Sequence, residues 1–283
     1  MAQYPRALAD YAEAARLAPT RINNWTRINN QGQLDPEQAA ACPDEAFRTG
    51  YLNVLNAVIQ QHPLATEVRI TRAVFLADTG RREQSQADLA VAAAANDGTY
   101  HPRFLAGLLA LRCDDQTIYR EICGSSLKHF ANSQEAPTCH FIAWTASVAP
   151  NALDDYRQAI MLAQRSVDLK PNDHQMLVGL AAVLYRAGRF AEALEQLTAA
   201  NDVPAGASTS PAYRSYFQAM THHQLAQPDE ASRWLERATQ ESRQELENVT
   251  APPTWNRRLT LKLLGAEATA LLVRDEETSL PEK

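Results

Sequence analysis

Apolar and small side chains recur at helical spacing on both sides of a glycine in residues 180–197, which read LAAVLYRAGRFAEALEQL. This spacing predicts one helix that ends near Gly188 and a second helix that begins after it, because apolar residues at intervals of three and four form one face. Ala193 marks the second helix, and Ala159 occupies the equivalent place 34 residues earlier. The pattern therefore predicts a helical hairpin that repeats.

The marker position can be followed along most of the chain. The markers are Ala7, Tyr51, Ser85, Tyr119, Ala159, Ala193 and Ala231. Three of the intervals between them are 34 residues, and the others, of 38, 40 and 44 residues, contain the same unit with an insertion. Gly80 and Asp114 lie where Gly188 lies in its own unit, and the segment 226–228 lies there in the last one. A fixed period of this length indicates a stack of supersecondary units.

The unit resembles the tetratricopeptide repeat (TPR), in which small residues lie where two helices touch and large residues point toward the next unit. By this resemblance the repeat-defining residues are Gly80, Ala159, Pro171, Leu180, Ala181, Gly188, Phe190, Ala193, Ala200 and Ala231. Small residues let antiparallel helices approach closely. A proline after a helix ends it, because proline cannot continue the helical hydrogen bonding. The resemblance implies an all-α fold, a right-handed α-solenoid of helix-turn-helix repeats with a C-terminal capping helix.

The register divides the chain into units of unequal quality. We expect the second helix of a truncated unit at 1–20, a degenerate unit with an irregular insert at 21–63, TPR units at 64–97 and 98–137, a degenerate unit at 138–172, the best-matching unit at 173–206, another at 207–244, a capping helix at 245–273 and a disordered tail at 274–283. The helix around Ala7 lacks a first-helix partner, so we expect either a longer chain or docking of that helix elsewhere. On the capping helix the expected buried face carries Trp255, Leu259, Leu263, Ala266 and Ala270.

Two stretches narrow the resemblance. APNALDDYRQAI (149–160) and HHQLAQPDEASRWLERA (222–238) are similar to the TPR C-terminal regions of planctomycete-type bacterial serine/threonine protein kinases and related multidomain proteins. No glycine-rich phosphate loop, HRD or DFG sequence occurs in the chain. The resemblance therefore implies a non-catalytic scaffold within a larger bacterial signalling protein, or alternatively a regulatory or ligand-sensing module that controls an attached kinase domain.

In this repeat the first helices line the concave side, and their register selects the positions of a partner-binding groove. These positions are Ile70, Val74, Phe104, Leu108, Trp144, Val178, Tyr185, Arg186, Tyr213, Tyr216, Met220 and His223. Their apolar and aromatic character favours a peptide or partner helix, without the lysine and asparagine that grip carboxylates in some TPR domains. Internal packing is the alternative: it is favoured for Trp144 and Phe104, and both interpretations stay open for Tyr213, Tyr216 and His223.

Composition and charge exclude several classes of partner. The 283 residues carry a formal net charge of −6 with both signs interspersed, so no basic stripe for nucleic acid is present. No apolar run approaches the roughly 20 residues of a membrane span. We therefore expect a cytoplasmic protein with a protein or peptide partner and no membrane contact, and the sequence leaves the oligomeric state open.

Candidate chemistry is sparse. The four cysteines form no CxxC pair, and the only histidine pair, His222 and His223, points about 100° apart on a helix. We expect neither a metal nor a cofactor. No GxSxG, HExxH or GxxxxGK motif occurs, so we expect no catalytic residue and no enzymatic activity.

Overall fold

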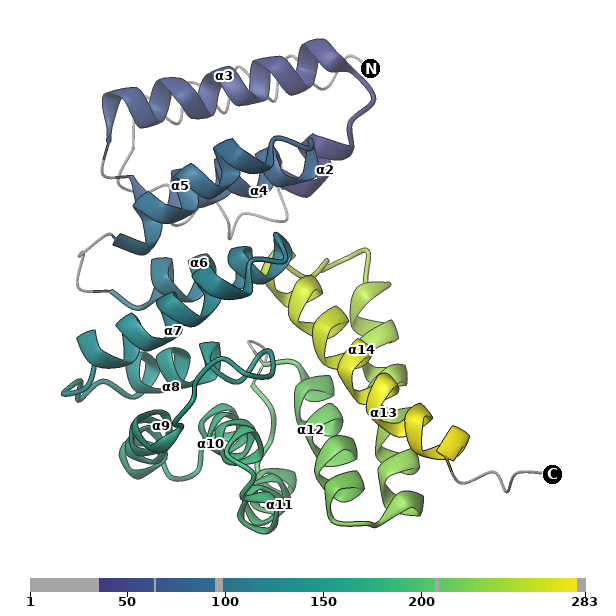
Figure 1. Ribbon diagram of the computed structural model, residues 1–283. Helices are drawn as coiled ribbons and strands as arrows, with labels where there is room; N and C mark the ends of the chain where they lie inside the picture. The colour runs from purple at the N-terminus through teal and green to yellow at the C-terminus, as the bar shows by residue number, and fades with distance from the viewer. Residues whose placement is uncertain (1–35, 64, 95–98, 207–208, 279–283) are drawn as a thin grey trace. The chain divides into compact units, whose positions relative to one another are not determined.

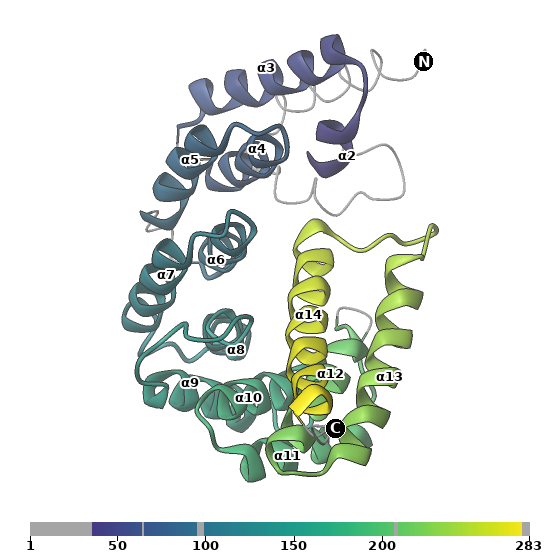
Figure 2. The same cartoon turned by 45° about the vertical axis from the view of Figure 1, so that its right-hand side comes forward.

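The computed structural model describes residues 36–63, 65–94, 99–206 and 209–278, which Figures 1 and 2 show from two sides. These residues form thirteen α-helices and contain no strand. The predicted all-α class is therefore confirmed. The helix predicted around Ala7 lies outside the described residues. Among the helices that are described, none combines the length and the apolar character that a membrane crossing requires.

The helices alternate between first and second members of hairpins. The first members are α2 (Pro36–Ala41), α4 (Thr66–Asp78), α6 (His101–Arg112), α8 (Ala136–Thr145), α10 (His174–Arg186) and α12 (Pro211–Gln224). The second members are α3 (Glu45–Gln61), α5 (Arg82–Ala94), α7 (Gln116–His129), α9 (Arg157–Leu169), α11 (Phe190–Ala199) with the 3-10 turn η2 (Ala200–Asp202), and α13 (Pro228–Leu246). The long helix α14 (Trp255–Thr278) follows the last hairpin.

The chain divides into two compact units, and each is described by itself. Unit 1 comprises the described residues up to Tyr119 together with 249–256, and unit 2 comprises 120–248 together with the described residues from 257 on. In unit 1, α4 packs against α5, and α2, α3 and α6 also pack against α4. In unit 2 the hairpins α8–α9, α10–α11 and α12–α13 pack in succession. The finer division expected from the sequence stays a prediction.

One type of turn closes four of the hairpins. In the first of them Gly80 adopts a left-handed conformation (φ 77°), and the next backbone N–H, of Arg81, donates to the carbonyl of Leu76 (2.8 Å). Such a bond satisfies a carbonyl at the helix end that has no partner within the helix. Equivalent bonds join Asp115 to Ala110, Arg189 to Leu184 and Gln227 to His222, after left-handed residues Asp114, Gly188 and Ala226 with φ of 56°, 75° and 55°.

The marker residues are completely buried in every second helix that the structure describes. Tyr51, Ser85, Tyr119, Ala159, Ala193 and Ala231 each have 0% exposed surface. In the hairpin α4–α5, Ser85 lies about one helical turn after the bonded Arg81, and its hydroxyl donates to the carbonyl of Ala73 on the facing helix (2.8 Å). The small side chain of Ser85 lets α4 and α5 approach closely, whereas Tyr51 and Tyr119 fill the same position with a large buried ring. The predicted helix-turn-helix repeat is confirmed.

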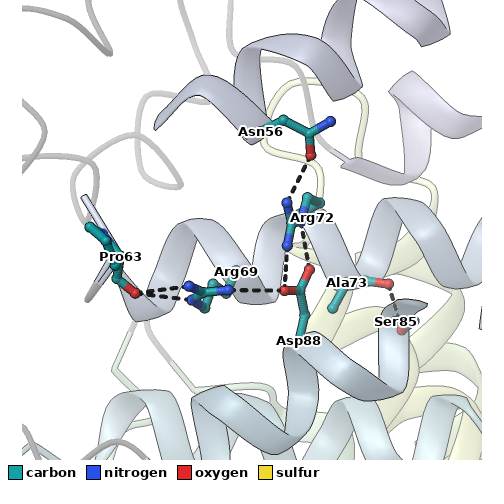
Figure 3. Close-up of polar contacts among 7 residues, drawn as sticks. All are labelled: Asn56, Pro63, Arg69, Arg72, Ala73, Ser85 and Asp88. Atoms are coloured by element: carbon teal, nitrogen blue, oxygen red, sulfur yellow. Dashed lines mark hydrogen bonds and ion pairs between the residues drawn. The ribbon is translucent and has the colours of Figure 1, made fainter. Parts of the chain in front are cut away.

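A buried carboxylate holds α3, α4 and α5 of unit 1 together (Figure 3). Asp88 is 3% exposed and accepts two hydrogen bonds of 2.6 Å from Arg72 and one of 3.3 Å from Arg69. Arg72 also donates to the side-chain oxygen of Asn56 (2.8 Å). Arg69 donates to the carbonyl of Pro63 (3.0 and 3.1 Å). Both carboxylate oxygens are therefore paired, and the donors come from the neighbouring helix of the repeat.

The two ends of the described chain depart from the regular repeat. Helix α2 has six residues, so the first helix of the degenerate unit is short, as the glycine and prolines in that stretch predict. Helix α14 extends to Thr278 and includes the first part of the segment 274–283, for which we expected disorder. Residues 279–283 lie outside the described part.

The buried face of α14 also differs from the expected one. Trp255 and Leu259 of the expected face are buried, but from position 260 onward the buried residues are Thr260, Leu261, Leu264 and Ala268. The expected residues Ala266 and Ala270 are exposed, and Leu263 is half-buried. At about 3.6 residues per turn, Ala266 and Ala270 lie on the side of the helix opposite to Leu264 and Ala268. The expected face was chosen from the apolar residues of the helix alone. The contacts of α14 that are described below explain why the opposite side is buried.

Candidate functional site

The predicted groove positions of unit 1 are buried. Ile70 and Val74 on α4, and Phe104 and Leu108 on α6, are between 0% and 6% exposed. In this structure their side chains pack internally, which is the alternative that the sequence favoured for Phe104. Their role in partner binding stays a prediction.

In unit 2 predicted positions on α8, α10 and α12 come together with Phe217 as a cluster of rings, two of which contact the guanidinium of Arg186. The ring of Trp144 lies 5.3 Å from that of Tyr213 and 6.0 Å from that of Phe217, centroid to centroid. The guanidinium carbon of Arg186 lies 5.4 Å from the ring centroid of Tyr185 and 5.8 Å from that of Phe217. We use the term aromatic face for Trp144, Tyr185, Arg186, Tyr213, Tyr216 and Phe217.

Phe217 is the member of the aromatic face that the sequence reasoning missed. Its side chain is completely buried, and its ring also contacts that of Tyr185 at 5.7 Å. The repeat register selects Tyr213 and Tyr216, whereas Phe217 lies four positions after Tyr213 and therefore shares its side of α12. That interval was the available signal. Among the other predicted positions of unit 2, Val178 and Met220 are buried and His223 is half-buried.

Helix α14 runs alongside α12 and α13 in both views (Figures 1 and 2), and its Glu267 meets the arginine of the aromatic face. Arg186 donates from Nη2 to Glu267 Oε2 (2.7 Å) and from Nη1 to Glu267 Oε1. Its Nε donates to the carbonyl of Ser147 (2.8 Å), and its side chain is 4% exposed. This two-pronged pairing is the geometry in which a guanidinium binds a carboxylate most strongly and most specifically.

The tyrosine hydroxyls of α12 make further contacts with α14. The hydroxyl of Tyr213 hydrogen bonds with Thr260 and Arg257, and burial raises its pKa while Arg257 opposes the shift. Arg257 also pairs with Glu245 of α13 at 2.9 Å. The start of α14 is thus fixed by polar contacts to both helices of the last hairpin.

The hydroxyl of Tyr216 lies where α14 carries a glycine. A Cβ atom on Gly265 would lie 2.9 Å from the Tyr216 hydroxyl oxygen and 3.3 Å from its Cζ, which is too close for a methyl group. Burial, followed by the nearby Glu267 carboxylate, raises the pKa of Tyr185 to about 12. Tyr185 is therefore a neutral phenol at physiological pH and serves as packing surface for Arg186.

A row of buried polar side chains lies on another side of α12. Arg214, Gln218 and Thr221 each contain a buried polar atom that has no hydrogen-bond partner within the described part of the chain. Both ring nitrogens of the buried His174 on α10 also have no hydrogen-bond partner within the described residues. Burial lowers the pKa of His174, and the positive charge of Arg214 lowers it further. Unpartnered buried groups oppose folding. The packing of α10 against α12 is therefore less complete than that around Asp88.

His140 on α8 is a second buried histidine. Burial lowers its pKa to about 4, although Asp173 opposes the shift. Its Nε2 lies 3.2 Å from the amide nitrogen of Gln175, and a Cβ atom on Gly179 would lie 2.4 Å from its Nδ1. The ring is thus neutral at pH 7 and enclosed by α10. Within the described ranges, no three His, Cys, Asp or Glu side chains are grouped as a metal site would require.

A hollow of about 460 Å³ lies between α9, α10 and α11 of unit 2. Its rim carries both signs of charge, from Arg165, Asp168, Arg189 and Glu192, and the side chain of Met161 is 60% exposed. The hollow is lined by both positive and negative side chains, whereas the aromatic face contains a single charged group, the paired guanidinium of Arg186. The aromatic face is therefore the stronger candidate site.

The chain was compared with protein families, curated proteins and solved structures. No protein-family model matches the chain, and no curated protein matches it. Among solved structures, yeast Tom70 matches with 17% identity over 92% of this chain and 49% of that chain (TM-score 0.45). A tetratricopeptide repeat protein from Parabacteroides merdae matches with 12% identity over 92% of this chain and 99% of that one (TM-score 0.46). A monomeric mutant of IFIT1 with m7Gppp-AAAA matches with 16% identity over 83% of this chain and 59% of that one (TM-score 0.40). The chain thus spans about half the length of the Tom70 chain.

Proposed function

We propose that this chain is a non-enzymatic protein-interaction scaffold and that the aromatic face of unit 2 binds a helix. The observation that supports the proposal is that this face already holds a helix, α14, through Arg186 and Glu267. Helices commonly bind proteins by laying one side into a groove, and tyrosine, tryptophan and arginine supply most of the energy at such interfaces. The face contains all three residue types: Trp144 contacts Tyr213, and Arg186 contacts Tyr185.

The decisive experiment is capture of proteins from a lysate of the source organism, with mass spectrometry as the readout. We expect the intact chain to retain a defined set of proteins and Arg186→Glu to reduce that set by about fivefold or more, since Arg186 is the only charge on the face. Arg189→Glu is the matched control, because it reverses the same charge on the exposed start of α11. Equal capture by all three chains would refute the proposal, with circular dichroism used to verify folding.

The absence of enzymatic activity is part of the same proposal. Its support is that the buried histidines, His140 and His174, are enclosed, and that burial keeps the hydroxyl of Tyr185, whose pKa is raised to about 12, in its neutral form. Nucleotide hydrolysis by the purified chain that is lost on substituting one of its own carboxylates or histidines would contradict it.

We further propose that the scaffold acts in the cytoplasm as part of a larger bacterial signalling protein. Its support is the resemblance of residues 149–160 and 222–238 to kinase-associated repeats, and the four cysteines, which are buried and form no disulfide. The alternative within this proposal is control of an attached serine/threonine kinase domain. The coding sequence upstream of Met1 tests both: a kinase frame supports the regulatory version, and a stop codon contradicts any attachment on that side.

A further inference from the structure

We propose that α14 is the resident occupant of the aromatic face, and that the protein partner takes its place with a helix of the same chemistry. The pattern is that of residues 261–268, L-x-x-L-G-x-E-A, in which the glycine faces Tyr216 and the glutamate faces Arg186. This inference rests on the proposed function and deepens it by naming the kind of helix that binds.

The first recognition element is steric. Gly265 is in the middle of α14, where glycine is the least favourable residue after proline for a helix. Its presence is explained by Tyr216, whose hydroxyl oxygen would lie 2.9 Å from any Cβ atom at that position. A helix with a larger residue there can approach α12 as closely only if the ring of Tyr216 shifts. The partner helix therefore presents a glycine at the same point.

The second recognition element is a single carboxylate. Arg186 is 4% exposed, so its charge is shielded from water by the rings of Tyr185 and Phe217 and by α14 itself. A helix without an acid at the position of Glu267 would leave this guanidinium buried and unpaired, which is strongly unfavourable. A helix with the acid restores both prongs of the pair. The face thus selects acidic helices and rejects neutral or basic ones.

The remaining buried residues of α14 fix the positions of Gly265 and Glu267 relative to α10 and α12. Leu261 and Leu264 precede Gly265 on the buried side, and Ala268 follows Glu267. Leucines at this spacing lie on one side of a helix, together with the alanine one turn later. A helix with the same pattern would place its glycine and glutamate opposite Tyr216 and Arg186 at once.

Helix α14 can leave this seat without opening a hairpin. It is not a member of any hairpin of unit 2, and the hydrogen bonds and ion pairs described above join only its residues 257–267. Its other side is exposed at Lys262, Ala266 and Thr269. The connection that precedes it is also exposed, with Val249 at 93%. Its departure would therefore expose the aromatic face while the three hairpins keep their own contacts.

The test uses the full chain and a fluorescein-labelled synthetic peptide of residues 255–272. Glu267→Arg in the chain places two positive charges together and is expected to release α14 from the face. We expect the peptide to bind this chain at least about tenfold more tightly than the wild-type chain in fluorescence anisotropy, because the peptide no longer competes with α14. Thr269→Arg is the matched control: it adds the same charge on the exposed side of α14 and should leave binding at the wild-type level.

Reversing the charges of Arg186 and Glu267 distinguishes specific recognition of the peptide from nonspecific exposure of the aromatic face. The chain with Arg186→Glu should lose the wild-type peptide and bind the peptide that carries Glu267→Arg. Failure of the peptide to bind the Glu267→Arg chain, or equal binding by the wild-type and Glu267→Arg chains, would overturn the inference. If capture from the lysate depends on Arg186 but the peptide does not bind, only this inference fails and the proposed function stands.

Hydrogen exchange of the wild-type chain is the second measurement, which does not depend on any variant folding. Amides in 259–268 should exchange at least about tenfold faster than those in the middle of α12, because α14 opens locally while the hairpin does not. Equal protection of the two helices would contradict a replaceable α14.

Discussion

Unit 1 and unit 2 each bury an arginine–carboxylate contact, but the two contacts connect different kinds of element. In unit 1, Asp88 accepts from two arginines of the adjacent helix, and the network stays within three consecutive helices of the repeat. In unit 2, Arg186 pairs with Glu267 of α14, which belongs to no hairpin and lies far along the chain. The first arrangement stabilises the repeat, and the second attaches something to it. A buried ion pair therefore has to be interpreted through the elements that it joins.

The largest expected effect tests the structural role of the unit 1 network. Asp88→Ala leaves the partly buried Arg69 and Arg72 without their carboxylate, and we expect a loss of about 3–5 kcal/mol in the free energy of unfolding. Asp88→Asn keeps an acceptor and should lose less. Urea unfolding followed by circular dichroism measures both. A loss below about 1 kcal/mol for the alanine variant would break the distinction between the units.

The next effect belongs to unit 2 and depends on pH. His140 has a pKa of about 4 in the folded chain and an ordinary value of 6.5 when unfolded. Below pH 6.5 the unfolded chain binds a proton that the folded chain does not, so stability falls as the pH is lowered, by roughly 3 kcal/mol between pH 6.5 and 4. His140→Gln should flatten the stability curve over this window in urea titrations. Parallel curves for the two proteins would contradict the assignment.

A smaller effect probes the seat of α14. Gly265→Ala places a methyl group against Tyr216, and we expect a loss of about 1–2 kcal/mol, less than the pH effect because the methyl also favours the helix. Tyr216→Phe removes the clashing hydroxyl and should restore part of that loss in the double variant. Gly124→Ala on α7 is the matched control, since no atom lies within 4 Å of its added Cβ. It should stabilise the chain, and a loss equal to that of Gly265→Ala would show that the contact with Tyr216 is not the cause.

The smallest effect concerns the turns, where the two units follow one rule. Gly80 of unit 1 and Ala226 of unit 2 both have left-handed backbones, and only glycine adopts this conformation without strain. Ala226→Gly should therefore raise the melting temperature slightly, corresponding to about 0.5–1 kcal/mol, and Gly80→Ala should lower it by a similar amount. Scanning calorimetry distinguishes these outcomes, and a lower melting temperature for Ala226→Gly would show that its turn is not strained.

The sequence predicts the repeat well because its determinants are local. Gly188 and Ala193 lie five positions apart, and the turn, the start of the helix and the buried marker all depend on residues within one hairpin. A period in the sequence is therefore enough to place them. The same reasoning selects Trp144, Tyr185, Arg186, Tyr213 and Tyr216, which the structure brings together in unit 2.

The contacts of the aromatic face are less predictable because they join distant positions. Arg186 and Glu267 are 81 residues apart, and nothing near either residue indicates the other. The expected face of α14 is correct for Trp255 and Leu259 and wrong for Ala266 and Ala270. The same distance explains the error, because the buried side there depends on Tyr216 and Arg186 and not on the apolar count of the helix. The row of unpartnered groups around Arg214 is invisible to a repeat template for the same reason, since the template describes small and apolar positions only.

The step of four residues from the turn-bonded residue to the marker is the same in four hairpins, although the intervals between hairpins vary. Extra residues lie within the hairpin α8–α9, whose helices are joined by residues 146–156, and also between hairpins, as in the segment that leads from α11 to α12, where Pro204, Ala205 and Gly206 are exposed. For protein engineering this joint is a natural insertion point for a fluorescent domain or an affinity tag, because added length there alters no hairpin. The chain can therefore lengthen at this joint while the hairpins on either side of it keep their size.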